Sequence, residues 1–197
     1  MKKLALSLFA FTIAIFVVAQ EKPKIKEVGI VFSNLENFGL SFKIGKEKAL
    51  WRINTLLIDG GNLEETMDSV VSKTSSIGFM FGVGREYRKT IAKNLELRYG
   101  ADLSFRFLKN KLDFNDNENT RLSTRTYYEP RFNLVFGFNY VIKEQLIIGA
   151  EILPYFSYTF GSFVDEFSDN DNRETDISRI DYGLSNTSIM LSVGYRF

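Results

Sequence analysis

The stretch ELRYGADLSFRF, from Glu96 to Phe107, indicates the type of fold, because its side chains alternate between two chemical types. The apolar and largely aromatic register consists of Leu97, Tyr99, Ala101, Leu103, Phe105 and Phe107. The charged or small register consists of Glu96, Arg98, Gly100, Asp102, Ser104 and Arg106. A period of two residues is typical of a β-strand, in which successive side chains point to opposite faces of the sheet. The stretch is therefore predicted to be a strand with one apolar and one polar face.

The same alternation recurs along the chain and predicts eight strands. They span residues 27–33, 38–45, 49–58, 76–87, 96–107, 128–142, 145–160 and 187–197. The connectors fall into a short set, residues 46–48, 88–93 and 143–144, and a long polar set, residues 59–75, 108–127 and 161–186. Short turns at one end and long loops at the other are typical of an up-and-down antiparallel barrel with two unlike rims.

Glycine indicates which face of the barrel is inside. The chain has 14 glycines, and those in the predicted strands all fall in the polar register, at Gly29, Gly39, Gly45, Gly78, Gly82, Gly84, Gly100, Gly137, Gly149 and Gly194. Side chains just fill the interior of an eight-stranded barrel, so inward positions need very small residues beside long charged ones. The apolar side chains are too many for so narrow a lumen, and an apolar exterior of this size requires lipid. We therefore predict an all-β fold, an eight-stranded antiparallel up-and-down transmembrane β-barrel.

The N-terminus is typical of a cleavable signal peptide over residues 1–19, which leaves residues 20–197 as one barrel domain. Lys2 and Lys3 form a basic start, residues 4–18 an apolar core, and Val17-Val18-Ala19 a small-residue cleavage site. A retained N-terminal helix is the alternative interpretation.

Composition excludes several classes of chemistry. The chain has no cysteine and no histidine, so it lacks a thiolate nucleophile, a His-assisted catalytic pair and the commonest zinc ligands. With 25 basic and 24 acidic residues, it has no electrostatic reason to bind nucleic acid. The acidic stretches 113–119 and 165–176 contain hard-cation ligands, but their spacing is not that of an EF-hand. We predict no enzyme activity, no catalytic or metal-binding residue and no cofactor.

These features together resemble the small eight-stranded outer-membrane β-barrels of Gram-negative bacteria, of the OmpA transmembrane-domain and OmpX type. Tyr195 and Phe197, in the terminal GYRF, match the assembly signal of that family, whereas Ser192 stands where the family usually has glycine. The resemblance implies insertion into the outer membrane of a Gram-negative bacterium by the barrel-assembly machinery. It also implies contact with outer-membrane lipid, periplasmic turns and surface-exposed loops.

The inward register carries charges of both signs. They are Lys43, Arg52, Glu86, Glu96, Arg98, Asp102, Arg106, Arg131, Glu151 and Arg196. Unpaired charges are costly in a narrow lumen, so we predict a structural network of ion pairs that plugs the barrel, with Arg98 paired to Asp102 or Glu151. A gate or transport path is the functional alternative.

Three functions follow from this architecture. The first is a non-enzymatic outer-membrane barrel with a plugged polar lumen, which presents its loops to an unknown partner or serves envelope integrity or assembly. The second is a narrow pore or solute channel through the lumen. The third is a soluble periplasmic barrel that binds an apolar ligand as lipocalins do.

Overall fold

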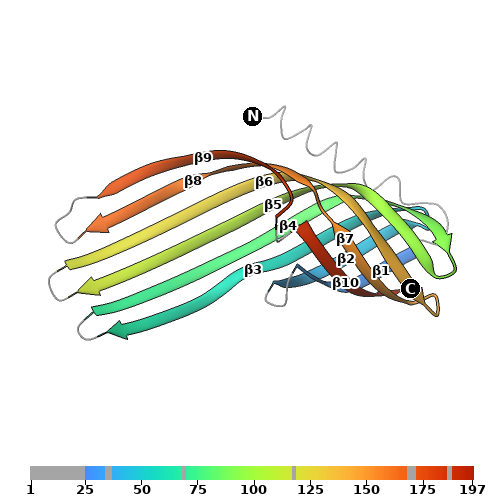
Figure 1. Ribbon diagram of the computed structural model, residues 1–197, viewed down its shortest axis with the longest axis horizontal. Coiled ribbons are helices and arrows are strands. Elements are labelled where there is room, and N and C mark those ends of the chain that lie inside the picture. The colour runs from blue at the N-terminus through green and yellow to red at the C-terminus, as the bar shows by residue number, and fades with distance from the viewer. Residues whose placement is uncertain (1–24, 34–36, 68–69, 117–118, 168–171, 186–187) are drawn as a thin grey trace, which may run out of the picture.

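The computed structural model describes residues 25–33, 37–67, 70–116, 119–167, 172–185 and 188–197. Within these ranges ten antiparallel strands form a single sheet (Figure 1). The strands are β1 (Ile25–Phe32), β2 (Phe38–Lys46), β3 (Ala49–Met67), β4 (Val70–Ala92), β5 (Leu95–Asp116), β6 (Asn119–Ile142), β7 (Leu146–Ile152), β8 (Tyr155–Phe167), β9 (Arg173–Gly183) and β10 (Ile189–Arg196). The predicted signal peptide, residues 1–19, lies outside the described residues. No helix among the described residues has the length and apolarity needed to cross a membrane.

Eight of these strands close into a ring. The order around it is β5-β4-β3-β2-β1-β10-β7-β6, and the pairing of β5 with β6 completes the circle. The first and last strands of the chain meet in this ring, with Val28 opposite Tyr195 and Phe32 opposite Leu191. The predicted strand 145–160 is interrupted at Leu153 and Pro154, between the end of β7 and the start of β8. The predicted eight-stranded antiparallel barrel is confirmed.

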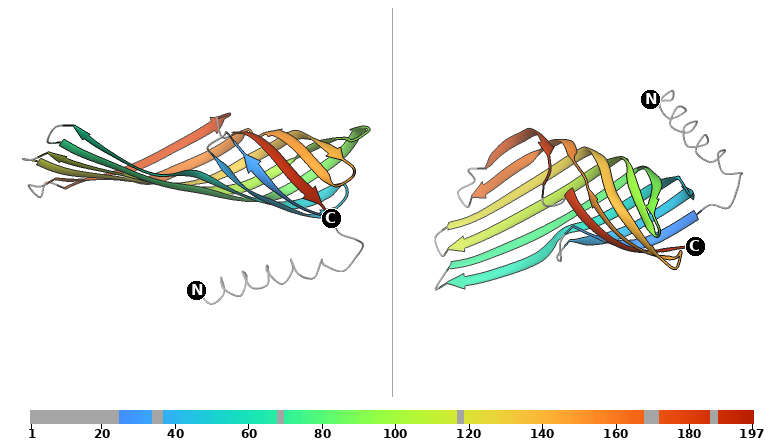
Figure 2. Two further views of the ribbon diagram at one scale, coloured as in Figure 1. Left: turned by 90° about the horizontal axis from the view of Figure 1, so that it is seen from below. Right: turned by 45° about the vertical axis from the view of Figure 1, so that its right-hand side comes forward.

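Past the ring, strands β3 to β6 continue and are joined by β8 and β9 in an open sheet, which we call the extension (Figures 1 and 2). It consists of residues 60–67 of β3, 70–77 of β4, 108–116 of β5, 119–127 of β6, 161–167 of β8 and 173–181 of β9. In the described residues these parts of β3 and β9 each have one paired neighbour, so the extension has two open edges.

The extension corrects one prediction from the sequence. Residues 59–75, 108–127 and 161–186 were predicted to be long polar loops, and most of them are strands instead. Both faces of these segments carry polar side chains, so they lack the sustained apolar alternation by which a strand is recognised in sequence. Their backbone groups are nevertheless paired in register, for example Leu63 with Thr74 and Leu112 with Ser123.

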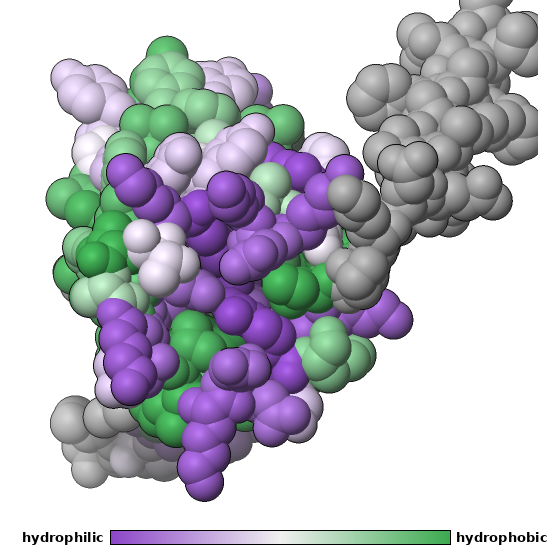
Figure 3. Space-filling view, turned by 90° about the vertical axis from the view of Figure 1, so that its right-hand side faces the viewer, coloured by the Kyte–Doolittle hydropathy of each residue, from purple (hydrophilic) through white to green (hydrophobic). Residues whose placement is uncertain are grey.

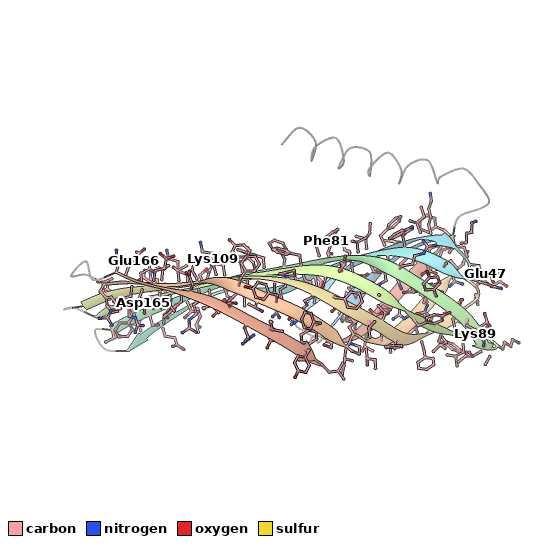
Figure 4. All side chains as sticks on the ribbon, turned by 90° about the horizontal axis from the view of Figure 1, so that it is seen from above. Glu47, Phe81, Lys89, Lys109, Asp165 and Glu166 are labelled. Carbon is pink, nitrogen blue, oxygen red and sulfur yellow. The ribbon has the colours of Figure 1, made fainter. Side chains whose placement is uncertain are left out.

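The two registers of the barrel strands face as predicted. In β5, Arg98 and Asp102 are buried in the lumen, whereas Leu103 on the opposite face is 64% exposed. Phe81 stands on the outer face in the same way (Figure 4). The lumen also contains apolar side chains that the sequence analysis missed, and they form one buried cluster of Val31, Leu56, Met80, Val135, Leu153 and Met190.

Aromatic rings form a contiguous row on the outer face where the barrel meets the extension. The ring centroids of Phe107 and Tyr128 lie 5.5 Å apart, those of Tyr128 and Phe160 5.5 Å, and those of Tyr158 and Phe160 5.9 Å. At the opposite end, Trp51, Tyr140 and Tyr195 are exposed on the same face. The apolar belt is thus bordered by aromatic side chains at both ends.

Candidate functional site

Two glutamates organise the charges at the centre of the lumen. Arg52 of β3 donates to Glu151 of β7 through Nη2 and Nη1, at 2.7 and 2.9 Å. The same guanidinium lies 3.3 Å from both Glu86 and Asp102, and it is only 1% exposed. Arg52 therefore joins carboxylates from three different strands, β4, β5 and β7.

The other central cations complete this arrangement. Lys43 Nζ of β2 donates to Glu86 Oε2 at 2.8 Å, and Arg98 Nη2 lies 3.0 Å from Glu151 Oε2. Of the two partners predicted for Arg98, the structure places Glu151 beside it, whereas Asp102 contacts Arg52 instead. Arg98 and Asp102 are close in sequence, yet each pairs with a charged side chain from another strand, because all of these side chains point into the lumen.

A second set of pairs lies toward the end of the barrel with the short turns. Arg88 binds Glu27 in a bidentate manner, with both nitrogen–oxygen distances 2.6 Å, and its Nε donates to Glu86 at 2.7 Å. Arg196 contacts the same Glu27 at 2.8 Å and Glu96 at 3.0 Å. Viewed from this end, hydrophilic side chains cover much of the surface (Figure 3). Because Arg88 contacts Glu86, the ion pairs near the short turns and those at the centre of the lumen form one connected network.

We call these ten residues the lumen network. It consists of Glu27, Lys43, Arg52, Glu86, Arg88, Glu96, Arg98, Asp102, Glu151 and Arg196. Five members are cationic and five are anionic, so their formal charges cancel. The cavity among them has a volume of about 20 Å³, which is room for about one water molecule.

Two predicted residues belong to a separate group. Arg106 and Arg131 share the carboxylate of Glu129, where the lumen opens onto the extension. The guanidinium of Arg131 also lies over the ring of Tyr155, 4.1 Å from its centroid. We call Arg106, Glu129 and Arg131 the mouth cluster.

Sequence analysis missed three of these charged residues. Arg88 fell in a predicted turn, Glu27 was the first residue of a predicted strand, and Glu129 had no assigned role. Arg88 could have been found by continuing the inward register of Gly84 and Glu86 by two more residues, since β4 extends to Ala92. Glu129 could likewise have been found, because it lies two residues before Arg131 and therefore points to the same side of the strand.

Glycines allow these long side chains to fit. A Cβ added at Gly84 would collide with the Asp102 carboxylate and the backbone carbonyl of Ala101. One added at Gly149 would lie 3.1 Å from Arg98 Nη2. The inward glycines therefore make room for the network, as the sequence pattern indicates.

Comparison with known families agrees with this geometry. Residues 66–171, more than half of the chain, match the family model described as the putative OmpA-OmpF-like porin family. The chain belongs to this porin family. The matched range contains Glu86, Arg98, Asp102 and Glu151, so the family region holds most of the centre of the lumen network. The predicted resemblance to small outer-membrane β-barrels is confirmed at the level of the family.

Solved structures of outer-membrane proteins show a distant likeness. A major outer membrane protein from Thermus thermophilus is 9% identical, with a TM-score of 0.47 over 89% of this chain and 100% of that chain. Ail, the attachment invasion locus protein of Yersinia pestis, is 16% identical, with a TM-score of 0.34 over 88% and 95% of the two chains. CarO of Acinetobacter baumannii is 11% identical, with a TM-score of 0.33 over 87% and 96%. No curated protein matches the sequence significantly.

Proposed function

We propose that this member of the porin family is a non-enzymatic barrel in the outer membrane of a Gram-negative bacterium, sealed to solutes, which displays the extension outside the cell as an interaction surface. The lumen network is the observation that carries this proposal. Most of its charges are buried, and most contact more than one partner, as with Arg52, which contacts Glu86, Asp102 and Glu151.

The energetics of the lumen support a seal. An ion that crosses must displace side chains held by buried, charge-assisted pairs, and breaking such a pair leaves an uncompensated charge. The apolar cluster around Leu56 and Val135 adds a second obstacle, because a hydrophobic constriction disfavours water and ions. A solute path would have to disrupt both layers.

The exterior supports the membrane location. A closed ring satisfies its backbone hydrogen bonds internally, which a structure in lipid must do. The apolar belt bordered by aromatic residues is the arrangement that outer-membrane barrels present to acyl chains and headgroups. Contact with outer-membrane lipid follows from the same surface.

Single-channel recording in planar lipid bilayers tests the seal. We expect no discrete current steps from the folded protein, with a conducting porin in the same bilayer as the control for insertion. Steady conductance would overturn the sealed lumen and favour the pore as the function.

Cysteine labelling tests the orientation, because the chain has no cysteine of its own. Lys109 is exposed on the extension, and Glu47 is exposed in a turn at the opposite end (Figure 4). We expect a membrane-impermeant maleimide to label K109C on intact cells, and E47C only after the outer membrane has been permeabilised. Labelling of both variants on intact cells would contradict the orientation. Release of the protein from membranes by carbonate without detergent would instead favour a soluble periplasmic binder.

We also propose that the closing strand β10 is the signal read by the barrel-assembly machinery. Tyr195 and Phe197 are exposed on the outer face, where a receptor can reach them. The backbone of Phe197 exchanges two 2.9 Å hydrogen bonds with Lys26 of β1, so recognition of this end is coupled to closure of the ring. Replacing Phe197 by alanine should lower the folded fraction in cells, seen as loss of heat-modifiable gel mobility, without preventing refolding of the purified chain in detergent.

A further inference from the structure

Cations without a carboxylate partner gather on two neighbouring hairpins at the end of the barrel with the short turns. The hairpins join β2 to β3 and β4 to β5, and the backbone N–H of Arg88 donates to the carbonyl of Lys48 at 3.0 Å, so the two turns are adjacent. The cations, none of which forms an ion pair among the described residues, are Lys46, Lys48, Arg85, Lys89 and Lys93. Outside the lumen network, Glu47 is the one acidic residue that the described part of these hairpin ends carries, and Figure 4 shows it at the same end as Lys89. This part of the surface therefore has an excess of positive charge.

Three of these cations stand on the outer face of the barrel and not in the lumen. Arg85 and Lys89 continue the register of Phe81 in β4, which is exposed on the outer face. Lys46 continues the register of Phe42 in β2 in the same way. Lys46 and Lys89 are exposed, and Arg85 is half-buried. The apolar belt thus ends in positive charge on these strands.

The strand register places the three cations around Tyr87. Across the sheet, Ala49 stands between Lys46 and Tyr87, and since neighbouring strands are about 4.8 Å apart, the two side chains start about 10 Å from each other. Along β4, Arg85 and Lys89 each lie two residues from Tyr87, which is about 7 Å. Because Ala49 has only a methyl group, no long side chain separates Lys46 from Tyr87. The three positive side chains are therefore within reach of one small anionic group.

Aromatic side chains set the depth of this surface in the membrane. Trp51 is 55% exposed, and the guanidinium of Arg85 lies 5.1 Å from its ring centroid. The ring of Tyr87 stacks on that of Tyr99, with centroids 5.7 Å apart. Tryptophan and tyrosine are enriched at the level of the lipid headgroups. The contact with Trp51 uses the charge of Arg85 and none of its N–H groups, which stay available to a phosphate oxygen.

We propose that this surface binds the headgroup of an anionic glycerophospholipid. We call it the rim patch, and it consists of Lys46, Trp51, Arg85, Tyr87, Lys89 and Tyr99. The cations bind the phosphate, and an anionic headgroup is preferred because a zwitterionic one brings an ammonium group to a surface that already has excess positive charge. A periplasmic protein or polymer fits less well, because Arg85 and Trp51 lie at the depth of the headgroups. The proposal rests on the proposed membrane location, and in the proposed orientation the lipid belongs to the periplasmic leaflet.

Quenching of tryptophan fluorescence tests the proposal, because Trp51 is the only tryptophan of this chain and belongs to the rim patch. The full chain is folded in phosphatidylcholine vesicles, and its folded state is established by gel mobility. The probes are phosphatidylglycerol and phosphatidylcholine, each brominated on the acyl chain near the headgroup, where bromine quenches only a nearby ring. We expect phosphatidylglycerol to quench Trp51 at a roughly tenfold lower mole fraction than phosphatidylcholine, since each nearby cation contributes up to roughly fivefold.

Matched variants locate the binding. K46Q/K89Q removes two exposed charges that have no ion pair, leaves Arg85 beside Trp51, and should lower the preference for phosphatidylglycerol by roughly fivefold. K109Q/K111Q is the control, because it removes two exposed lysines from the outer face of the extension, far from Trp51. We expect this control to keep the preference of the wild type.

Unlabelled competitors identify the source of the phosphate. Unlabelled phosphatidylglycerol should restore the fluorescence of Trp51, whereas glycerol phosphate at millimolar concentration should not. Lipid A should restore it no better than phosphatidylglycerol at equal phosphate concentration. Stronger restoration by lipid A or by glycerol phosphate would assign the rim patch to another ligand and overturn the proposal.

Two further results would overturn it. One is equal quenching by the two brominated lipids, which would leave the membrane barrel intact but show no selection of the anionic headgroup. The other is an equal loss of preference in K46Q/K89Q and K109Q/K111Q, which would mean that the overall charge of the protein attracts the lipid. Absence of quenching by either lipid would instead show that Trp51 does not face a bilayer, and would contradict the proposed membrane location itself.

Discussion

Strands β3 to β6 run through two regions of the molecule, and their charged side chains behave differently in each. In the barrel, Arg52 is 1% exposed and contacts three carboxylates. In the extension, Lys73 Nζ lies 3.3 Å from Glu64 Oε1, and both side chains are more than half exposed. The same strand geometry therefore holds buried, multiply bonded charges in the barrel, whereas in the extension it also holds solvated pairs such as Lys73 and Glu64.

The two regions also differ in what holds their strands together. The barrel has a closed ring, an apolar cluster and the lumen network. The extension has open edges and relies on backbone pairing and on cross-strand contacts such as Arg121 over the Phe167 ring, 5.4 Å from its centroid. Individual cross-strand contacts contribute less than about 1 kcal/mol. We therefore expect equivalent substitutions to have large effects in the barrel and small ones in the extension.

The largest expected difference is between two Glu→Gln substitutions. Glu86→Gln removes the charge that Lys43, Arg52 and Arg88 share, so it should lower the free energy of unfolding by about 3–5 kcal/mol. Glu64→Gln makes the same change in the extension and should cost less than about 1 kcal/mol. Urea unfolding of the protein in lipid vesicles measures both values. Equal effects would show that the lumen charges are solvated.

A glycine substitution in the lumen is expected to be the next largest effect. Gly84→Ala introduces a Cβ that meets the Ala101 carbonyl and the Asp102 carboxylate. The backbone cannot move away easily, so we expect a loss of about 1–3 kcal/mol in the same urea unfolding experiment. A neutral result would mean that the lumen has more free space than its cavity suggests.

The corresponding substitution in the extension should have the opposite sign. A Cβ added at Gly60 has no neighbour within 4 Å. Because glycine in a strand is less stable than alanine by roughly 0.5–1 kcal/mol, Gly60→Ala should stabilise this part of β3 by about that amount. Amide hydrogen exchange over residues 60–67 would report the gain as slower exchange. Faster exchange would indicate a contact with Gly60 that this structure lacks.

The smallest expected effect depends on pH. Arg121 Nη2 lies 2.9 Å from Asp165 Oδ2, and this hydrogen bond, together with one from Ser123, holds the pKa of the Asp165 carboxyl below its usual value. The carboxylate therefore stabilises the pairing of β6 with β8 at neutral pH. This contribution is lost as the pH falls below about 4, through the lowered pKa.

Asp165→Asn provides the control for this pH dependence. Hydrogen exchange of the β6 and β8 amides should be slower in the wild type than in D165N at about pH 6, and the difference should vanish at about pH 2. A difference that persists at the lower pH would mean that packing at this position, and not the charge, stabilises the two strands.

Much of the barrel can be predicted from sequence, because its strands have one apolar and one polar face. In the stretch from Glu96 to Phe107 the alternation predicts the strand, and the register of the glycines predicts the side that faces the lumen. The extension could not be predicted in this way. Its segments have at most a short apolar register. Leu108, Leu112 and Phe114 alternate with charged residues, but Asn110 interrupts them and residues 115–121 are polar throughout, so the pattern is too short to distinguish a loop from a strand.

The residue pattern is enough to predict an antiparallel barrel with an apolar exterior and a charged lumen, because the two-residue period and the placement of glycine depend on local chemistry. Which charges pair can be read from the folded barrel but not from the residue pattern. Arg98 and Asp102 are four residues apart on one face of a strand, but each bonds a group from another strand, Glu151 and Arg52 respectively. Closure of the ring sets these distances, and a linear pattern holds no information about the stagger that brings two strands together across a lumen.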